Sequence, residues 1–164
     1  MSLGSRRKAR GLALQVLYAQ DLAAGGGGGA DEAVATYGER FELDIEPEAR
    51  EFAQVLTRAA SRDPAAVDAA ITAASRNWRL ERMARVDRNI LRLAVGELQH
   101  VPETPVKVVI NEAVELAKRF GTAESPAFVN GVLDRVAHGL DRPAAAEVSA
   151  AEPSSDGEPP DGAA

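Results

Sequence analysis

Apolar residues recur every three or four positions through most of this chain, which is the spacing of residues on one face of an α-helix. No run shows the sustained alternation of apolar and polar residues that is typical of a half-buried strand. Only VKVVI, at 106–110, has the β-branched density of a strand, and the helical periodicity of the EAVELAKRF that follows favours a helix. The pattern predicts an all-α protein, a compact bundle of about six or seven helices. The expected helices cover residues 5–22, 47–60, 64–74, 84–99, 106–121 and 125–137.

The apolar stripes indicate how these helices pack. The stripes of the first three are Ala9, Leu12, Ala13, Val16 and Leu17; Phe52, Val55, Leu56 and Ala59; and Val67, Ala70, Ile71 and Ala74. Each of these helices is expected to bury one face. In 84–99 the apolar residues extend further around the helix: Val86, Ile90, Leu91, Leu93, Ala94, Val95 and Leu98. That helix is therefore expected to be central.

Several residues mark where helices begin, end or pass close to one another. Thr104 and Ser125 can accept hydrogen bonds from the first free amides of a helix, and each is followed by a proline suited to the first helical position. Gly121 is expected to end its helix in the left-handed conformation, which leaves a tight corner before the last helix. Gly96 and Gly131 lie inside helical patterns, where glycine costs stability, and a close helix crossing explains them better than a neutral glycine.

The net charge of −6 is concentrated at the end of the chain. Residues 141–164 contain six acids and one arginine, so they carry −5 and residues 1–140 carry −1. This segment has little apolar surface to offset conformational entropy, so we expect a disordered acidic tail. Gly25–Gly29 is expected to be a flexible linker, because each glycine costs about 1 kcal/mol in a helix relative to alanine. The predicted organisation is one helical domain over 1–140 and a tail over 141–164.

The composition argues against a metalloprotein, a secreted protein and an enzyme. The chain has no cysteine, and its two histidines, His100 and His138, are a poor basis for a metal site. No apolar run approaches the roughly 20 residues that span a bilayer, and no secretory leader follows the basic start. The glycine run lacks the Lys-Ser/Thr of a phosphate loop, and no nucleophile has a recognisable base beside it. We therefore expect a cytoplasmic protein without cofactor or catalytic residues.

Two sets of basic residues are candidates for binding a polyanion. Arg6, Arg7, Lys8 and Arg10 cluster toward the exposed beginning of the first helix, where cations can neutralise phosphates. The alternative is a solvated helix end, and the helix dipole disfavours cations there. Trp78 could stack on an RNA base, but burial is the commoner use of an isolated tryptophan. The second set, most simply interpreted as a solvated face, consists of Arg76, Arg79, Arg82, Arg85, Arg88 and Arg92.

Four segments of the chain form a set: ALQVLYAQDL (13–22), RNILRLAVGEL (88–98), VKVVINEAVELAKRFG (106–121) and FVNGVLDRVA (128–137). In this order, after an arginine-rich start, they resemble the NusB family of bacterial transcription antitermination factors. The resemblance spans about residues 5–140, and the last two segments together are highly specific. It implies two packed helical subdomains that bind the boxA element of ribosomal RNA leader transcripts. It also implies assembly with NusE, a small-subunit ribosomal protein, and with RNA polymerase and other Nus factors, without catalysis.

The resemblance also implies roles for individual residues. The family's RNA-binding positions fall on Arg6, Arg7, Lys8, Arg10, Arg92 and Phe128. The NusE-facing positions fall on Tyr18, Asp87 and Glu124, where acidic groups suit a basic ribosomal partner. Cations can contact phosphates, and an aromatic ring can stack on an unpaired base. The glycine run and the tail depart from the compact family pattern, and the −5 charge of the tail motivates the hypothesis that it competes with RNA for the basic start.

Two other interpretations stay open at this stage. A helical protein–protein adaptor would leave the basic residues merely solvated, and a test of RNA binding separates it from the first interpretation. A detached relative of the NusB-like domain that precedes some ribosomal RNA methyltransferases is disfavoured, because no catalytic domain or glycine-rich cofactor motif follows. The sequence does not decide between a monomer and a homodimer, in which a self-association face could cover the basic start.

Overall fold

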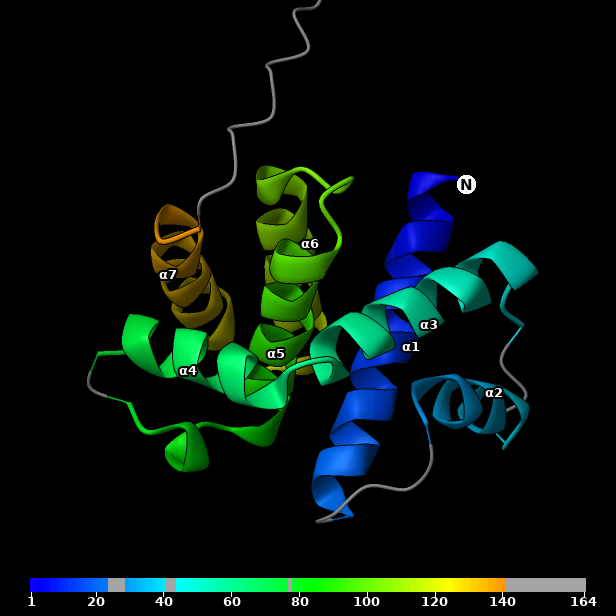
Figure 1. The fold of residues 1–164 in the computed structure, drawn as a ribbon, viewed down its shortest axis with the longest axis horizontal. Coiled ribbons are helices and arrows are strands. Elements are labelled where there is room, and N and C mark those ends of the chain that lie inside the picture. The colour runs from blue at the N-terminus through cyan, green and yellow to red at the C-terminus, as the bar shows by residue number, and fades with distance from the viewer. Residues whose placement is uncertain (24–28, 41–43, 77, 141–164) are drawn as a thin grey trace, which may run out of the picture.

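The structure, a computed structural model, describes residues 1–23, 29–40, 44–76 and 78–140. All regular structure in these residues is helical (Figure 1). The elements are α1 (Leu3–Leu22), α2 (Ala30–Arg40), α3 (Pro47–Ser61), α4 (Pro64–Ala74), the 3₁₀ helix η1 (Leu80–Arg82), α5 (Arg85–His100), α6 (Val106–Phe120) and α7 (Ser125–His138). The all-α prediction is confirmed, including a helix at the strand-like VKVVI. The predicted tail, and the predicted linker except Gly29, lie outside the described residues.

The helices form two groups that meet at α5. Helices α1, α2 and α3 pack on one another, while α4, α6 and α7 gather around α5 (Figure 1). Helix α5 also contacts α1 and α3, so it joins the two groups. Its residues from Asn89 to Leu98 are buried, apart from the half-buried Arg92. The prediction of two packed subdomains with 84–99 at the centre is confirmed.

The predicted apolar stripes hold for α1 and α4 and are partly wrong for α3. All five stripe residues of α1 are buried. In α3, however, Val55 is 38% exposed, and three alanines are buried instead: Ala49, Ala53 and Ala60. Helix α3 contacts α1, α2 and α5, so small residues are needed where the helices approach most closely. None of the helices in the described part of the chain is long and apolar enough to cross a membrane.

The two interior glycines have different environments. A Cβ built on Gly96 would lie 2.6 Å from the Cα and 2.7 Å from the backbone nitrogen of Ala60. This confirms a close crossing of α5 and α3. A Cβ on Gly131 would meet nothing within 4 Å beyond the backbone of its own helix. The close crossing predicted at Gly131 is therefore wrong.

The helix ends differ in detail from the predicted caps. Helix α1 begins at Leu3, because the Ser2 hydroxyl accepts a hydrogen bond from the Ser5 amide at 3.1 Å. Thr104 does not occupy the cap of α6, which falls on Pro105. Ser125 is already the first residue of α7.

The corner between α6 and α7 explains the roles of Ser125 and Gly121, which differ from the predicted ones. The Ser125 hydroxyl accepts a hydrogen bond from the Thr122 amide at 2.9 Å instead of capping its own helix. Gly121 is extended, with φ −93° and ψ −166°, and not left-handed as predicted. A Cβ at Gly121 would lie 2.5 Å from the Ser125 hydroxyl oxygen. Glycine is required here because Ser125 folds back over it.

Candidate functional site

The exposed start of α1 presents three of the four predicted cations. The side chains of Arg7 and Lys8 are 57% and 58% exposed, and Arg6 is half-buried. Arg7 donates from Nε and Nη2 to the Glu112 carboxylate of α6 at 3.1 and 2.9 Å. Lys8 lies 4.0 Å from a carboxylate oxygen of Glu46. Ion pairs with an exposed cation contribute little to stability, so a phosphate can displace the carboxylates.

The neighbours of the α1 start fix its position on α3. The Ser5 hydroxyl donates a hydrogen bond to the Glu46 carboxylate, just before the first residue of α3. The Arg6 guanidinium lies 5.7 Å from the centre of the Phe52 ring, a cation–π distance. The backbone that carries Arg6 and Arg7 is therefore held against the body of the protein and not left to fray.

The prediction that all four cations at the start of α1 are exposed is wrong for Arg10. Its side chain is 3% exposed, and its Nη2 and Nε donate to the Glu97 carboxylate of α5 at 2.6 and 3.1 Å. Glu97 is itself buried. Helix α1 packs on α3 and α5, and each of its residues from Ala9 to Leu14 is buried, whereas Arg7 and Lys8 face solvent. Arg10 joins α1 to α5 in this structure and is not available to a ligand.

Arg92, another predicted RNA contact, also lies in an internal network. Its Nε and Nη2 donate to the Asp68 carboxylate of α4 at 2.9 and 3.0 Å, and its Nη1 is 3.6 Å from Asp21. Asp21, near the end of α1, also accepts hydrogen bonds from Arg88 and Asn89 at 2.7 and 2.9 Å. The interpretation of this arginine series as a solvated face is therefore wrong for Arg88 and Arg92. Both link α5 to its neighbours.

Electrostatics in this network favours the charged side chains. Burial raises the pKa of Asp21, but hydrogen bonds from Arg88 and Asn89 and the charges of Arg88 and Arg92 lower it more, so the net pKa is below its ordinary value. Burial lowers the pKa of Arg92, but the hydrogen bonds and charges of Asp68 and Asp21 together raise it more, so the net pKa is above its ordinary value. The network therefore stays ionised near neutral pH and holds α1, α4 and α5 together.

The aromatic candidate Phe128 lies in the first turn of α7 and is half-buried against the core. Its ring centre is 6.3 Å from that of Trp78, with the ring planes at 65°. Trp78 is 54% exposed, so the expectation that it anchors its loop in the core is wrong. Trp78 instead contacts the Phe128 ring from the connection before η1.

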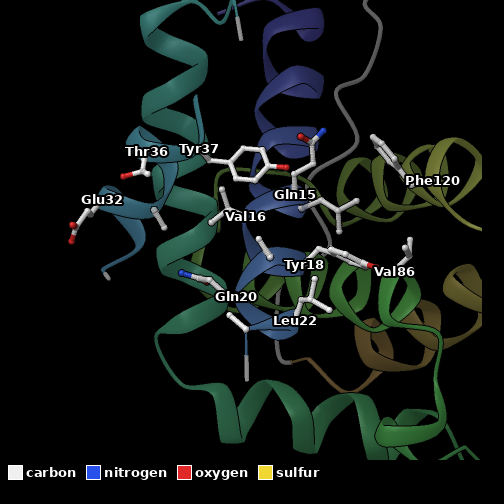
Figure 2. Close-up of a pocket in the computed structure, with 14 residues that line it drawn as sticks. Gln15, Val16, Tyr18, Gln20, Leu22, Glu32, Thr36, Tyr37, Val86 and Phe120 are labelled. Carbon is white, nitrogen blue, oxygen red and sulfur yellow. The ribbon is translucent and has the colours of Figure 1, made fainter. Parts of the chain in front are cut away.

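A pocket of about 800 Å³ lies at the other end of α1, between α1, α2, the start of α5 and the end of α6 (Figure 2). Tyr18, Val86 and Phe120 share its lining, and the Tyr18 ring is 37% exposed. Leu22, which is 60% exposed, lies one turn further along α1. The lining is mostly apolar, which is typical of a surface that binds a protein or small ligand.

The two predicted acidic contacts flank this pocket in the sequence. Asp87 directly follows the lining residue Val86, and Glu124 lies in the corner four residues after the lining residue Phe120. Glu124 is exposed. The Oδ1 of Asp87 is buried and has no hydrogen-bond partner among the described residues, an arrangement that costs stability unless a ligand donates to it. Tyr18 lines the pocket, while Asp87 and Glu124 are near lining residues in the sequence and do not line it themselves.

Sequence reasoning missed the contribution of α2 and of Leu22 to this pocket. Tyr37 and Thr36 line it from α2, a helix for which no bounds were predicted. One signal was available: Tyr18 and Leu22 are four residues apart, so they share a face of α1 that is not the buried stripe. A second apolar face on a helix whose first face is buried indicates an additional packing surface.

Comparison with known proteins agrees with this geometry. The family model described as the NusB family matches residues 7–138. The transcription antitermination protein NusB of Sorangium cellulosum (strain So ce56) is 52% identical over 140 residues, which cover 85% of this chain and 96% of that protein. The solved structure of T. maritima NusB has a TM-score of 0.72 and 34% identity, covering 84% of this chain and 93% of the other.

A second solved structure contains antitermination factors NusB and NusE in complex with dsRNA. It aligns with a TM-score of 0.73 and 29% identity over 85% of this chain and 100% of the matched chain. The family match covers most of the described helices. The similar sequences and the similar solved structures are both NusB proteins. This chain therefore belongs to the NusB family of non-enzymatic transcription antitermination factors.

Proposed function

We propose that this protein binds the boxA element of ribosomal RNA leader transcripts together with NusE, and that it joins RNA polymerase and other Nus factors to keep ribosomal RNA transcription processive. The observation that carries the proposal is the exposed start of α1, where Arg7 and Lys8 are held only by surface ion pairs. A related NusB has been solved with NusE and RNA, which supports the same partners for this chain.

The RNA contact is proposed to run from the α1 start toward α7. Arg6, Arg7 and Lys8 would contact phosphates, and each neutralised phosphate releases counterions. Helix α6 leads from Glu112, the partner of Arg7, to Phe120 at its end, a distance of about 12 Å along the axis. Phe128 follows in the first turn of α7, where its ring would stack on an unpaired base. Arg10 and Arg92 would support this surface from within.

The NusE contact is proposed at the pocket lined by Tyr18, Val86 and Phe120. Its apolar lining would bury apolar side chains of the partner, and Tyr18 is an exposed aromatic residue of the type that dominates interface energies. Asp87 and Glu124 would pair with basic groups of the ribosomal protein. A donor from NusE would also satisfy the unpaired buried oxygen of Asp87.

Charge reversal at the α1 start tests the RNA contact. We expect Arg7→Glu/Lys8→Glu to weaken binding to a single-stranded boxA RNA on the order of tenfold or more at low salt. The slope of log affinity against log salt should fall by about 1.4, because each phosphate contact contributes about 0.7 for single strands. Affinity is measured by titration of labelled RNA at several salt concentrations, with and without NusE.

A matched control variant carries the same change of net charge away from the start of α1. Arg58 forms an exposed ion pair with Asp31 like that of Arg7, and Arg62 is exposed beyond the end of α3. Arg58→Glu/Arg62→Glu should retain RNA binding. Equal losses in both variants would mean that only net charge matters, and unchanged binding of Arg7→Glu/Lys8→Glu would contradict the proposed contact.

Reversal of one pocket charge tests the NusE contact. Asp87→Lys should weaken NusE binding by about tenfold or more, because it replaces an attractive charge by a repulsive one. RNA binding by the free protein should stay unchanged. Glu51→Lys, at an exposed position of α3, is the matched control. Calorimetric titration with NusE measures both variants after their unfolding curves have been compared. Full NusE affinity in Asp87→Lys would remove Asp87 from the interface.

A further inference from the structure

Trp78 is exposed although tryptophan is the side chain with the most apolar surface to bury. It is the sole tryptophan of the chain, and 54% of it is accessible. It follows α4 and directly precedes the cap residue of η1, so it lies on the connection between α4 and the central helix α5. An exposed indole carries a cost in water, which a ligand that covers it would remove.

The indole is supported by a second ring. Phe128 contacts it edge-to-face, with 6.3 Å between the ring centres. Phe128 itself packs against the buried core from the first turn of α7. The pair therefore joins two segments distant in the sequence, the connection before α5 and the first turn of α7. An edge-to-face pair with one half exposed leaves ring surface available to a third aromatic ring.

The charges next to this pair suit an anionic ligand. Arg79 follows Trp78 directly and Arg82 lies three residues further, and both are exposed. Neither forms an ion pair with another described residue, whereas Arg85, Arg88 and Arg92 of the same series all face Asp21. Glu81 lies between them, so two cations against one acid leave a net charge of +1 on residues 79–82. These are cations without an internal structural partner in the described part of the chain.

We infer that Trp78 and Phe128 form a stacking platform for one unpaired RNA base, and that Arg79 and Arg82 contact the adjoining phosphates. Aromatic rings beside unpaired cations are the usual chemistry of single-stranded RNA sites. A protein-docking surface would be expected to have apolar neighbours, and the residues that flank Trp78 along the chain are charged or polar. The inference rests on the proposed RNA binding and extends its path beyond Phe128 to the connection before α5.

The fluorescence of Trp78 provides a direct test, because no other tryptophan contributes. Titration of the full chain with a single-stranded boxA oligonucleotide should change the emission saturably, as stacking on a base alters the environment of the indole. Trp78→Ala should weaken RNA binding at least about fivefold, the effect of losing one stacked base. Trp78→Phe keeps a ring and should retain most of the affinity. Arg79→Ala and Arg82→Ala should each lower the salt slope by about 0.7.

Val55→Ala is the control, since it trims another exposed apolar side chain, on α3, and should not alter RNA binding by the free protein. If wild-type protein binds the RNA without any change in emission, and Trp78→Ala binds as tightly as wild type, the platform is wrong while the proposed function stands. If Trp78→Ala weakens NusE binding and not RNA binding, the surface docks protein and the inference is overturned. Failure of wild-type protein to bind the RNA, with or without NusE, would reject both.

Discussion

Replacing Arg10 by alanine is expected to lower the free energy of unfolding by about 3–5 kcal/mol. The substitution leaves the Glu97 carboxylate buried in the core without the guanidinium that donates to both its oxygens. A lone buried charge of this kind is costly, because neither water nor another cation replaces the lost partner. The Arg10 guanidinium also lies 5.4 Å from the Phe52 ring centre, so the substitution removes a contact to α3 as well.

Urea unfolding followed by circular dichroism measures this loss, and Arg7→Ala is the control. Arg7 forms the same two-pronged contact with Glu112, but its side chain is exposed. Its loss should cost only a small fraction of what the loss of Arg10 costs. Similar small losses for Arg7→Ala and Arg10→Ala would show that the Arg10–Glu97 pair is hydrated in solution.

The double variant Arg10→Met/Glu97→Leu separates the structural role of Arg10 from a direct RNA contact. Replacing both members of a buried ion pair by apolar residues is often neutral or stabilising, so this variant should fold. Its affinity for boxA RNA should match that of wild type if Arg10 acts only through the position of α1. A well-folded double variant with reduced RNA affinity would mean that Arg10 leaves Glu97 and contacts the RNA.

Local patterns were sufficient to predict most of the fold. The bounds of α4 agree with the prediction at both ends, and the wide apolar stripe identified the central helix α5. Periodicity depends on residues three or four apart, which a sequence displays directly. Helix α2 was missed as a defined element, since Val34 and Tyr37 are its only large apolar residues to mark a buried face.

The roles of individual cations could not be read from local sequence. Arg10 and Glu97 are 87 positions apart, and no spacing rule relates them. Arg7 and Arg10 look alike in the RRKAR cluster, yet Arg7 is exposed, while Arg10 is buried against Glu97 of α5 and Phe52 of α3. Trp78 shows the converse: its large apolar side chain favours burial, but it lies on a connection between helices and is exposed.

Alanine substitutions at the two interior helix glycines are expected to have opposite effects. Gly96→Ala should destabilise the protein by about 1–3 kcal/mol, because the new methyl group would meet the backbone of Ala60 at 2.6 Å. Backbone cannot move aside as a flexible side chain can, so α3 and α5 must separate. Since α5 joins the two helical groups, this separation should weaken the contact between them.

Gly131→Ala provides the matched comparison, with the same change in a different environment. Space for the methyl group is open there, so only the higher helix propensity of alanine remains, and stability should rise by up to about 1 kcal/mol. Thermal unfolding of both variants under one set of conditions measures the difference. If Gly96→Ala were also stabilising, α3 and α5 would have to lie further apart in solution than this structure places them. The close approach of Gly96 to Ala60 would then no longer explain why a glycine occupies the middle of the central helix.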